Sequence, residues 1–165
     1  MIKKRYHVDL PGQQAECEAN YNRLQRILQN VVSWKLNETR QYLLGNSLVS
    51  ESRILFSVIE QTKYTTLVHI VQDVPLKNQR LSDKTVTDDE GRAGIYNANV
   101  RLYHDVRLAE VVVCQPYRQF TSRYEYPNDD MHQVSEKMQI NRFLGELLSH
   151  CLAYARVDYW VTVSG

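Results

Sequence analysis

The stretch that decides the fold reads RILFSVIE over residues 53–60 and YTTLVHIVQ over residues 64–72. Both segments alternate between side chains of different polarity and are rich in Ile, Val, Thr, Phe and Tyr, a pattern typical of β-strands. Only Gln61, Thr62 and Lys63 separate them. A connection this short joins neighbouring antiparallel strands, so the pattern predicts a β-hairpin.

A second hairpin is predicted further along the chain. Residues 99–103 and 108–115 again have strand-like patterns, and they are separated by His104, Asp105, Val106 and Arg107. Residues 117–126 are a candidate fifth strand. Residues 41–44 are a short candidate strand that ends at Gly45 and Asn46, a pair typical of turns.

A helix is predicted at each end of this strand-rich region. Asp9 is a suitable N-cap for the first helix, and Pro11 is tolerated in its first turn. Apolar residues then recur at steps of three and four, at Cys17, Tyr21, Leu24, Leu28 and Val31. The last helix is predicted over residues 131–156, with a stripe of Val134, Met138, Asn141, Leu144, Leu148, Cys151 and Ala155.

Strands grouped between two helices, rather than alternating with them, indicate an α+β fold. We expect an antiparallel sheet of about four to five strands built from two hairpins, flanked by an N-terminal helix and a long C-terminal helix. No linker divides the chain, so residues 1–165 are expected to form a single domain. Residues 75–96 are polar and acidic and are interpreted as a flexible loop, and residues 159–163 as a terminal strand or tail.

The composition excludes several classes of protein. Twenty basic and nineteen acidic residues give a net charge of +1, which provides no general attraction to nucleic acid or to an acidic membrane. No run of 18 apolar residues occurs, so no membrane association is expected. Cys17, Cys114 and Cys151 lack the spacing of a zinc or redox motif. We therefore expect reduced thiols, no cofactor, and a cytoplasmic location.

Several longer stretches are distinctive. They read KKRY over residues 3–6, TKYTTLV over 62–68, VRLYHD over 100–105 and RYEYPN over 123–128, the last leading into His132 and Gln133. In these segments the chain resembles the YqiB-like family, uncharacterised proteobacterial proteins with a domain of unknown function. The resemblance covers most of the chain and departs at residues 75–96, which look longer here. It implies a small cytosolic protein and brings no established activity, cofactor or catalytic residue.

A first cluster of candidate functional residues surrounds the second hairpin turn and comprises Arg101, Tyr103, His104, Asp105 and Glu110. Asp105 suits a turn, and Arg101 is expected to form a cross-strand ion pair with Glu110. A functional interpretation makes His104 a general base oriented by a carboxylate. The chain lacks a nucleophile-elbow serine and a histidine pair at metal-ligand spacing, so the structural interpretation is favoured.

A second cluster lies at the junction between the last strand and the last helix and comprises Arg123, Tyr124, Tyr126, Asn128, His132, Gln133, Glu136, Lys137, Asn141 and Arg142. So many hydrogen-bonding groups exceed what a helix cap requires. One interpretation is a polar network, including an Arg123–Glu136 ion pair, that attaches the helix to the sheet. The other is a binding surface anchored by Tyr and Arg, and the sequence leaves both open.

No complete catalytic or metal site is recognisable in the sequence, which favours a non-enzymatic adaptor or regulatory module that binds a protein partner. The alternative is an RNA- or ribosome-associated factor that uses Arg101, Arg107, Arg123, Tyr124, Lys137 and Arg142. A weaker alternative is a metal-dependent hydrolase centred on His104, Asp105 and Glu110. Exposed sheet edges and amphipathic helices also leave a homodimer open.

Overall fold

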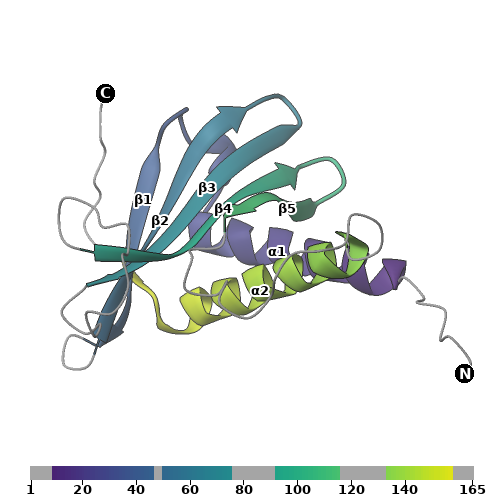
Figure 1. The fold of residues 1–165 in the computed structure, drawn as a ribbon. Coiled ribbons are helices and arrows are strands. Elements are labelled where there is room, and N and C mark those ends of the chain that lie inside the picture. The colour runs from purple at the N-terminus through teal and green to yellow at the C-terminus, as the bar shows by residue number, and fades with distance from the viewer. Residues whose placement is uncertain (1–8, 47–49, 76–91, 116–132, 158–165) are drawn as a thin grey trace, which may run out of the picture.

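The computed structural model describes residues 9–46, 50–75, 92–115 and 133–157. In chain order its elements are helix α1 (Leu10–Leu28), 3-10 helix η1 (Val31–Ser33), strands β1 (Thr39–Asn46), β2 (Ser50–Gln61), β3 (Thr65–Pro75), β4 (Arg92–Tyr103) and β5 (Leu108–Gln115), helix α2 (Gln133–Tyr154) and strand β6 (Arg156–Val157). Figure 1 shows one curved sheet with the two long helices packed against it.

The strands form one antiparallel sheet in the order β5-β4-β3-β2-β1-β6. Both predicted hairpins are present, because β2 pairs with β3 and β4 pairs with β5. The last strand, β6, has two residues and adds a short edge to five longer strands. The predicted α+β fold, an antiparallel sheet flanked by an N-terminal and a C-terminal helix, is confirmed.

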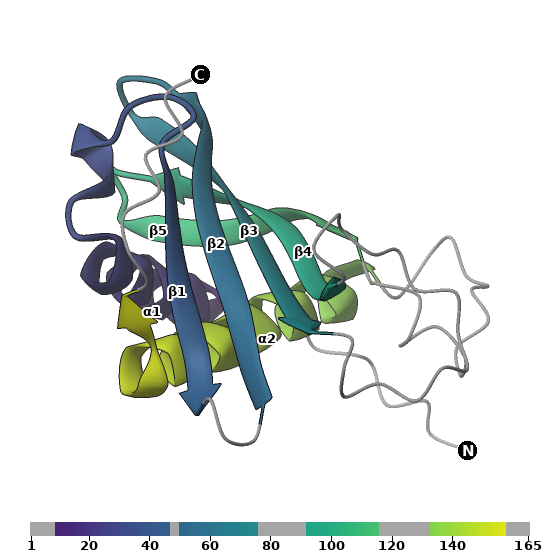
Figure 2. The ribbon, with the colours of Figure 1, turned by 90° about the vertical axis from the view of Figure 1, so that its left-hand side faces the viewer.

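Both helices cover the same face of the sheet, which we name the covered face (Figures 1 and 2). Alternate side chains of each long strand point into it, as the period of two in a strand requires. On β2 these are Ile54, Phe56 and Val58, all fully buried. The same core contains Leu24 and Leu28 of α1, Val68 and Ile70 of β3, Val100 and Leu102 of β4, and Leu144 and Leu148 of α2.

The start of α1 and the bounds of α2 agree with the sequence analysis. The Asp9 carboxylate accepts a hydrogen bond from the Gly12 amide at 3.0 Å, which satisfies one of the free N–H groups of the first turn. Helix α2 runs from Gln133 to Tyr154, inside the predicted range of 131–156. After Ala155 the chain continues directly into β6, which pairs with β1.

Side chains of the following segment satisfy the last carbonyl groups of α1. Tyr42 donates to the carbonyl of Ile27 at 2.8 Å, and Arg40 and Trp34 donate to the carbonyl of Leu28 at 2.8 Å and 3.1 Å. The guanidinium of Arg40 also lies 3.9 Å from the ring centre of Trp34. These contacts fix the end of α1 against β1.

Two turn or loop predictions are wrong where the structure describes them. The predicted loop over residues 75–96 is too long, because Pro75 pairs with Arg92 and residues 92–96 belong to β4. The polar composition of residues 92–96 gave no strand signal in the sequence. Their strand conformation comes from pairing with β3. Gly45 and Asn46 are not a turn but the end of β1, paired with Glu51 and Ser50.

Residues 76–91, 116–132 and 158–165 lie outside the described part of the chain. The predicted strands over 117–126 and 159–163 fall there, as does the greater part of the predicted loop. Among the helices that are described, none is long and apolar enough to span a membrane.

Candidate functional site

The face of the sheet opposite the helices, which we name the open face, carries three of the predicted functional residues, Arg101, Tyr103 and Glu110. In Figure 2 it is turned toward the viewer, with α1 and α2 behind the strands. Strand alternation and the pairing register place on it Thr39, Gln41 and Leu43 of β1, Arg53, Leu55, Ser57 and Glu60 of β2, Leu67, His69, Val71 and Asp73 of β3, Asn97, Asn99, Arg101 and Tyr103 of β4, and Glu110 and Val113 of β5.

The middle of the open face is apolar. Leu55 and Val71 are directly opposed across β2 and β3. Leu43 lies on β1 beside Arg53, and Leu67 lies further along β3, beyond His69. All four apolar side chains are half-buried, whereas their neighbours on the covered face are fully buried. Neither of the two long described helices covers this face, and an apolar centre there is unusual, since sheet faces without helices are commonly polar.

Polar side chains surround this centre and are bonded to one another across the strands. The strongest contact joins Arg53 to Asp73, whose Oδ2 accepts from Nε at 3.1 Å and from Nη2 at 2.7 Å. The other pairs are His69–Asn97 at 2.8 Å, Thr39–Ser57 at 2.8 Å, Arg101–Glu60 at 3.0 Å and Tyr103–Glu110 at 3.5 Å. The rim of the open face is therefore held together by contacts within the chain itself.

Arg101 lies opposite Glu110 in the register, as predicted, but the expected ion pair between them does not form. Arg101 Nη1 instead bonds Glu60 Oε1 on β2, two strands away. Glu110 accepts from the hydroxyl of Tyr103. Partial burial raises the pKa of Tyr103, and the negative charge of Glu110 raises it further.

His104 is separated from these residues and lies on the helix side of the sheet. Its Nδ1 is 3.1 Å from the hydroxyl of Tyr21 on α1, and its Nε2 is 2.8 Å from the hydroxyl of Thr66 on β3. Partial burial lowers the pKa of the imidazole from its ordinary value of 6.5, and the charge of Asp105 opposes the shift. With both ring nitrogens bonded, His104 joins the turn to α1, while Asp105 is exposed.

The predicted residues on α2 divide into buried and exposed groups. Asn141 is buried, accepts from the amide of Val111 at 2.9 Å and donates to the carbonyl of Lys137 at 2.9 Å. Since β5 is an edge strand, this contact satisfies an amide that has no partner strand. The carbonyl of Asn141 also accepts from the buried side chain of Asn20. In contrast, Glu136, Lys137 and Arg142 are exposed.

The remainder of the second cluster is not described. Arg123, Tyr124, Tyr126, Asn128 and His132 lie outside the described residues, and so does the predicted Arg123–Glu136 ion pair. Gln133 begins α2. Of the two clusters, therefore, Arg101, Tyr103 and Glu110 share the open face, whereas His104 and Asn141 support the packing of the helices.

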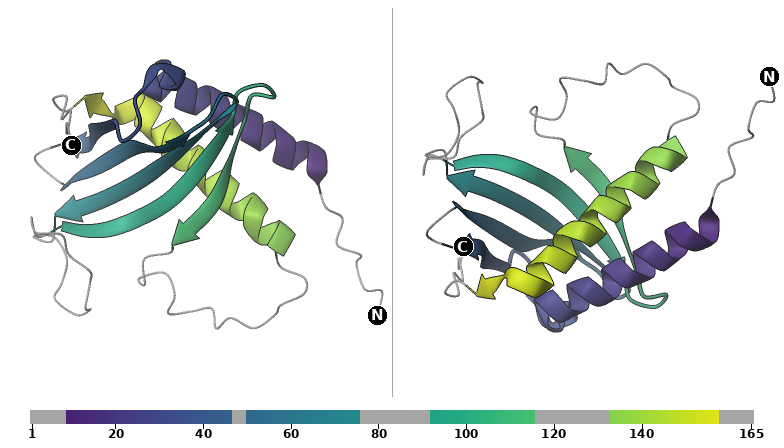
Figure 3. Two further views of the ribbon diagram at one scale, coloured as in Figure 1. Left: turned by 90° about the horizontal axis from the view of Figure 1, so that it is seen from above. Right: turned by 90° about the horizontal axis from the view of Figure 1, so that it is seen from below.

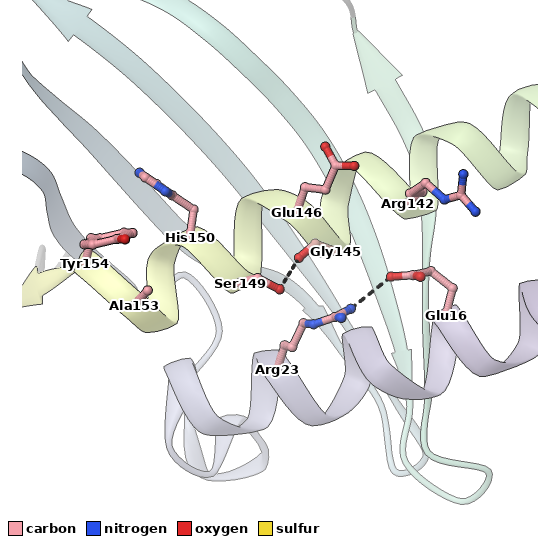
Figure 4. Close-up of a pocket in the computed structure, with 9 residues that line it drawn as sticks. All are labelled: Glu16, Arg23, Arg142, Gly145, Glu146, Ser149, His150, Ala153 and Tyr154. Carbon is pink, nitrogen blue, oxygen red and sulfur yellow. Dashed lines mark hydrogen bonds and ion pairs between the residues drawn. The ribbon is translucent and has the colours of Figure 1, made fainter.

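A groove of about 470 Å³ runs between the helices on the side away from the sheet. Figure 3 shows both helices from that side, and Figure 4 shows the lining side chains. Arg23 of α1 bonds Glu16 at 2.9 Å, and Ser149 of α2 donates to the carbonyl of Gly145 at 2.7 Å. The other lining residues are Arg142, Glu146, His150, Ala153 and Tyr154.

Metal and thiol chemistry receive no support in the described part of the chain. Within it, no group of three His, Cys, Asp or Glu side chains is placed to hold a metal ion. Cys17, Cys114 and Cys151 are free thiols. Burial raises the pKa of Cys17 to about 11 and that of Cys151 to about 12, which suppresses the reactive thiolate.

Sequence reasoning missed most of the open face. Glu60, His69 and Asp73 were not among the candidates, although each bonds a side chain on a neighbouring or nearby strand. The sequence marks these three residues only as polar positions within or beside apolar strand segments. Predicting that they share one face of the sheet requires the pairing register of the strands.

An antiparallel sheet with two helices on one face and an ordered polar rim on the other defines a small α+β protein without a recognisable catalytic centre in its described residues. The family model described as protein of unknown function (DUF1249) matches residues 23–156. The chain is also 36% identical over 151 residues to the uncharacterized protein YqiB of Escherichia coli strain K12, covering 92% of this chain and 94% of the relative. YqiB of Escherichia coli O157:H7 matches to the same extent.

The chain belongs to the DUF1249 family, which confirms the resemblance noted in the sequence. No solved structure matches it.

Proposed function

We propose that this protein is a non-enzymatic adaptor or regulatory module that binds a protein partner through the open face of its sheet. The observation that carries the proposal is the apolar centre of Leu43, Leu55 and Val71, with Leu67 beyond His69 on the same strand as Val71. The polar side chains around it are bonded to one another. Protein interfaces have this composition, with an apolar core and a polar rim.

The contacts that hold the charged side chains of the open face favour its use in binding a macromolecule. Arg53 and Arg101 are each held by a carboxylate, so little side-chain entropy remains to be lost when a partner docks. Arg101 and Tyr103 belong to the residue types that contribute most at interfaces. They lie side by side with Glu110 at one end of the apolar centre.

The open face fits a protein better than RNA. RNA-binding sheets present several aromatic rings for stacking, together with cations for phosphate. Among the side chains that the structure describes, Tyr103 is the one tyrosine, phenylalanine or tryptophan of the open face, because Tyr42, Phe56 and Tyr96 point into the covered face.

The cations of the open face whose side chains are described already have acceptors. Arg53 and Arg101 bond carboxylates, and Arg156, at the β6 edge, donates to the carbonyl of Gly45 at 2.9 Å. Arg142 lies in the helix groove on the other side of the molecule. Arg101 and Arg142 thus do not belong to one basic stripe, which weakens the RNA alternative.

The hydrolase alternative required His104 to act with Asp105 and Glu110. The ring nitrogens of His104 instead face the hydroxyls of Tyr21 and Thr66, on the helix side of the sheet, while Glu110 lies on the open face. These positions favour a structural role for His104, and we propose no catalytic residue.

Affinity capture with matched variants tests the proposal. Val113 on the open face and Val32 in η1 are exposed to similar extents, 48% and 54%. Tagged wild-type protein, Val113→Asp and Val32→Asp would be used to capture partners from a lysate of the source organism, with and without ribonuclease. We expect to capture one protein whose recovery is unaffected by ribonuclease. Its recovery should be unchanged with Val32→Asp as bait and reduced with Val113→Asp.

Capture of RNA or ribosomes that ribonuclease abolishes would replace this proposal with the RNA alternative. Capture that is equal for both variants would place the contact elsewhere. Circular dichroism of both variants controls for unfolding.

A further inference from the structure

The outward side of α2 has a regular arrangement of long and short side chains. Arg142, Glu146, Ser149 and Ala153 follow one another at steps of four, three and four, so they form one line along the helix. All four are exposed and line the groove between α1 and α2 (Figure 4). The two long charged residues come first and the two short residues last.

The groove is closed at one point and open beyond it. At Gly145 side chains of α1 lie so close to α2 that a β-carbon would be 2.9 Å from Arg23 Nη1 and 3.0 Å from Asn20 Oδ1. The ion pair between Glu16 and Arg23 lies over this point. Toward the end of α2 the groove is lined by Ser149 and Ala153. Both are exposed, and their short side chains do not cover the groove.

Arg142 and Glu146 are one turn apart but do not pair with each other. Among the described residues, neither has an ion-pair or hydrogen-bond partner, and Figure 4 shows Arg142 directed along the groove, away from Glu146. His150 contacts the ring of Tyr154, with the ring centres 5.0 Å apart. The groove side of α2 therefore carries a cation and an anion in this line and an imidazole beside it.

We propose that the occupant of this groove is a second copy of the chain, with the two α2 helices packed antiparallel about a two-fold axis near residues 147 and 148. In such a pair, positions whose numbers add to a constant face each other. Arg142 then faces the partner's Ala153, and Glu146 faces the partner's Ser149. A long side chain meets a short one at both of these levels, which lets two helices pack closely.

The chemistry of the facing residues agrees with their size. Glu146 lies beside the hydroxyl of the partner's Ser149 and the imidazole of the partner's His150, both of which can donate a hydrogen bond to a carboxylate. The two-fold axis creates each contact twice. A contact of this kind uses the same surface on both copies and closes at two, as in most homo-oligomers. A partner of unrelated sequence would have to reproduce this order of charge and size, whereas a second copy has it already.

This interface is independent of the proposed binding function, because the groove and the open face lie on opposite sides of the molecule. The dimer would present two open faces directed away from each other. It would therefore bind partners in pairs, with the gain in avidity that two linked sites provide.

Sedimentation velocity of the full chain over a wide concentration range tests the proposal. We expect the wild type to form a dimer. Ala153→Arg should raise its dissociation constant by about tenfold or more, because Arg142 then faces an arginine at each end of the α2–α2 interface. The double variant Arg142→Ala with Ala153→Arg exchanges the long and short positions and should restore the dimer. Asn22→Arg adds a cation to an exposed position of α1 outside the groove and should have no effect.

A monomeric wild type at every concentration would overturn the proposal. So would a dimer that Ala153→Arg leaves unchanged, or a double variant that is no better than the single one. Circular dichroism of each variant confirms that the helices remain folded, so a loss of dimer reflects the interface.

Discussion

On the covered face of the sheet, most side chains of β2, β3 and β4 are apolar and fully buried beneath two helices. The open face instead carries polar pairs and four half-buried apolar residues. Both faces belong to the same strands, and neighbouring residues such as Phe56 and Leu55 serve opposite ones. One face therefore provides most of the stability. The other is free to vary in chemistry, which is what recognition requires.

The largest expected difference between the faces is in apolar packing. Phe56→Ala should lower the free energy of unfolding by about 3–5 kcal/mol, because it opens a cavity in the covered core. Leu55→Ala, at the next position of β2, should cost about 1 kcal/mol, because its side chain is half-buried. Urea unfolding of both variants measures this, and equal losses would contradict the distinction between the faces.

Within the open face, the polar pairs should differ in strength according to their exposure. The side chains of Arg53 and Asp73 are 16% and 8% exposed, and those of Arg101 and Glu60 are 27% and 47% exposed. Asp73→Ala should cost about 2–3 kcal/mol, since it leaves a partly buried guanidinium without its carboxylate. Glu60→Ala should cost about 0.5 kcal/mol or less. A reversed order in chemical unfolding would show that exposure does not govern these pairs.

Two asparagines compare a buried polar group of α2, on the covered side of the sheet, with a half-buried one on the open face. Asn141→Ala should cost about 1–2 kcal/mol, because the amide of Val111 on the edge strand β5 loses its buried acceptor. Asn99→Ala, on the half-buried open face, should change the free energy of unfolding by about 0.5 kcal/mol or less. Loss of hydrogen-exchange protection at Val111, measured by NMR, would confirm the cause for Asn141.

The smallest effect expected is the pH dependence that His104 contributes. Burial lowers its pKa in the folded protein below 6.5, so the unfolded chain takes up a proton first as the pH falls. The contribution is complete above pH 6.5 and is lost as the pH falls through the folded-state pKa. His104→Asn should flatten the stability profile below pH 6.5. An unchanged slope in that variant would assign the pH dependence to other groups.

Much of the fold could be predicted because its pattern is local. The alternation in residues 53–58 places Ile54, Phe56 and Val58 on one side, and the structure buries these three residues together. Asp9 gave the start of the first helix, but the predicted stripe ran on to Val31, which lies in η1 beyond the end of α1 at Leu28. Register and antiparallel order follow from a connection of three residues between β2 and β3.

The open face could not be predicted, because its contacts depend on irregularities in the strands. A bulge between Val58 and Glu60 shifts the register by one residue and moves Glu60 from the covered to the open face. Without that bulge Glu60 could not reach Arg101, which lies 41 positions away in the sequence. The contact of His104 with Tyr21 likewise joins a turn to a helix 83 positions away, and no local pattern encodes it.

Site-specific photocrosslinking in living cells tests the central claim most directly. A photoreactive amino acid would replace Val113 on the open face in one strain and Val32 in η1 in another. The proposed function predicts a discrete protein adduct from position 113 and none of that mass from position 32. No protein adduct at position 113, or the same adduct from both positions, would contradict the assignment of the open face as the partner-binding surface.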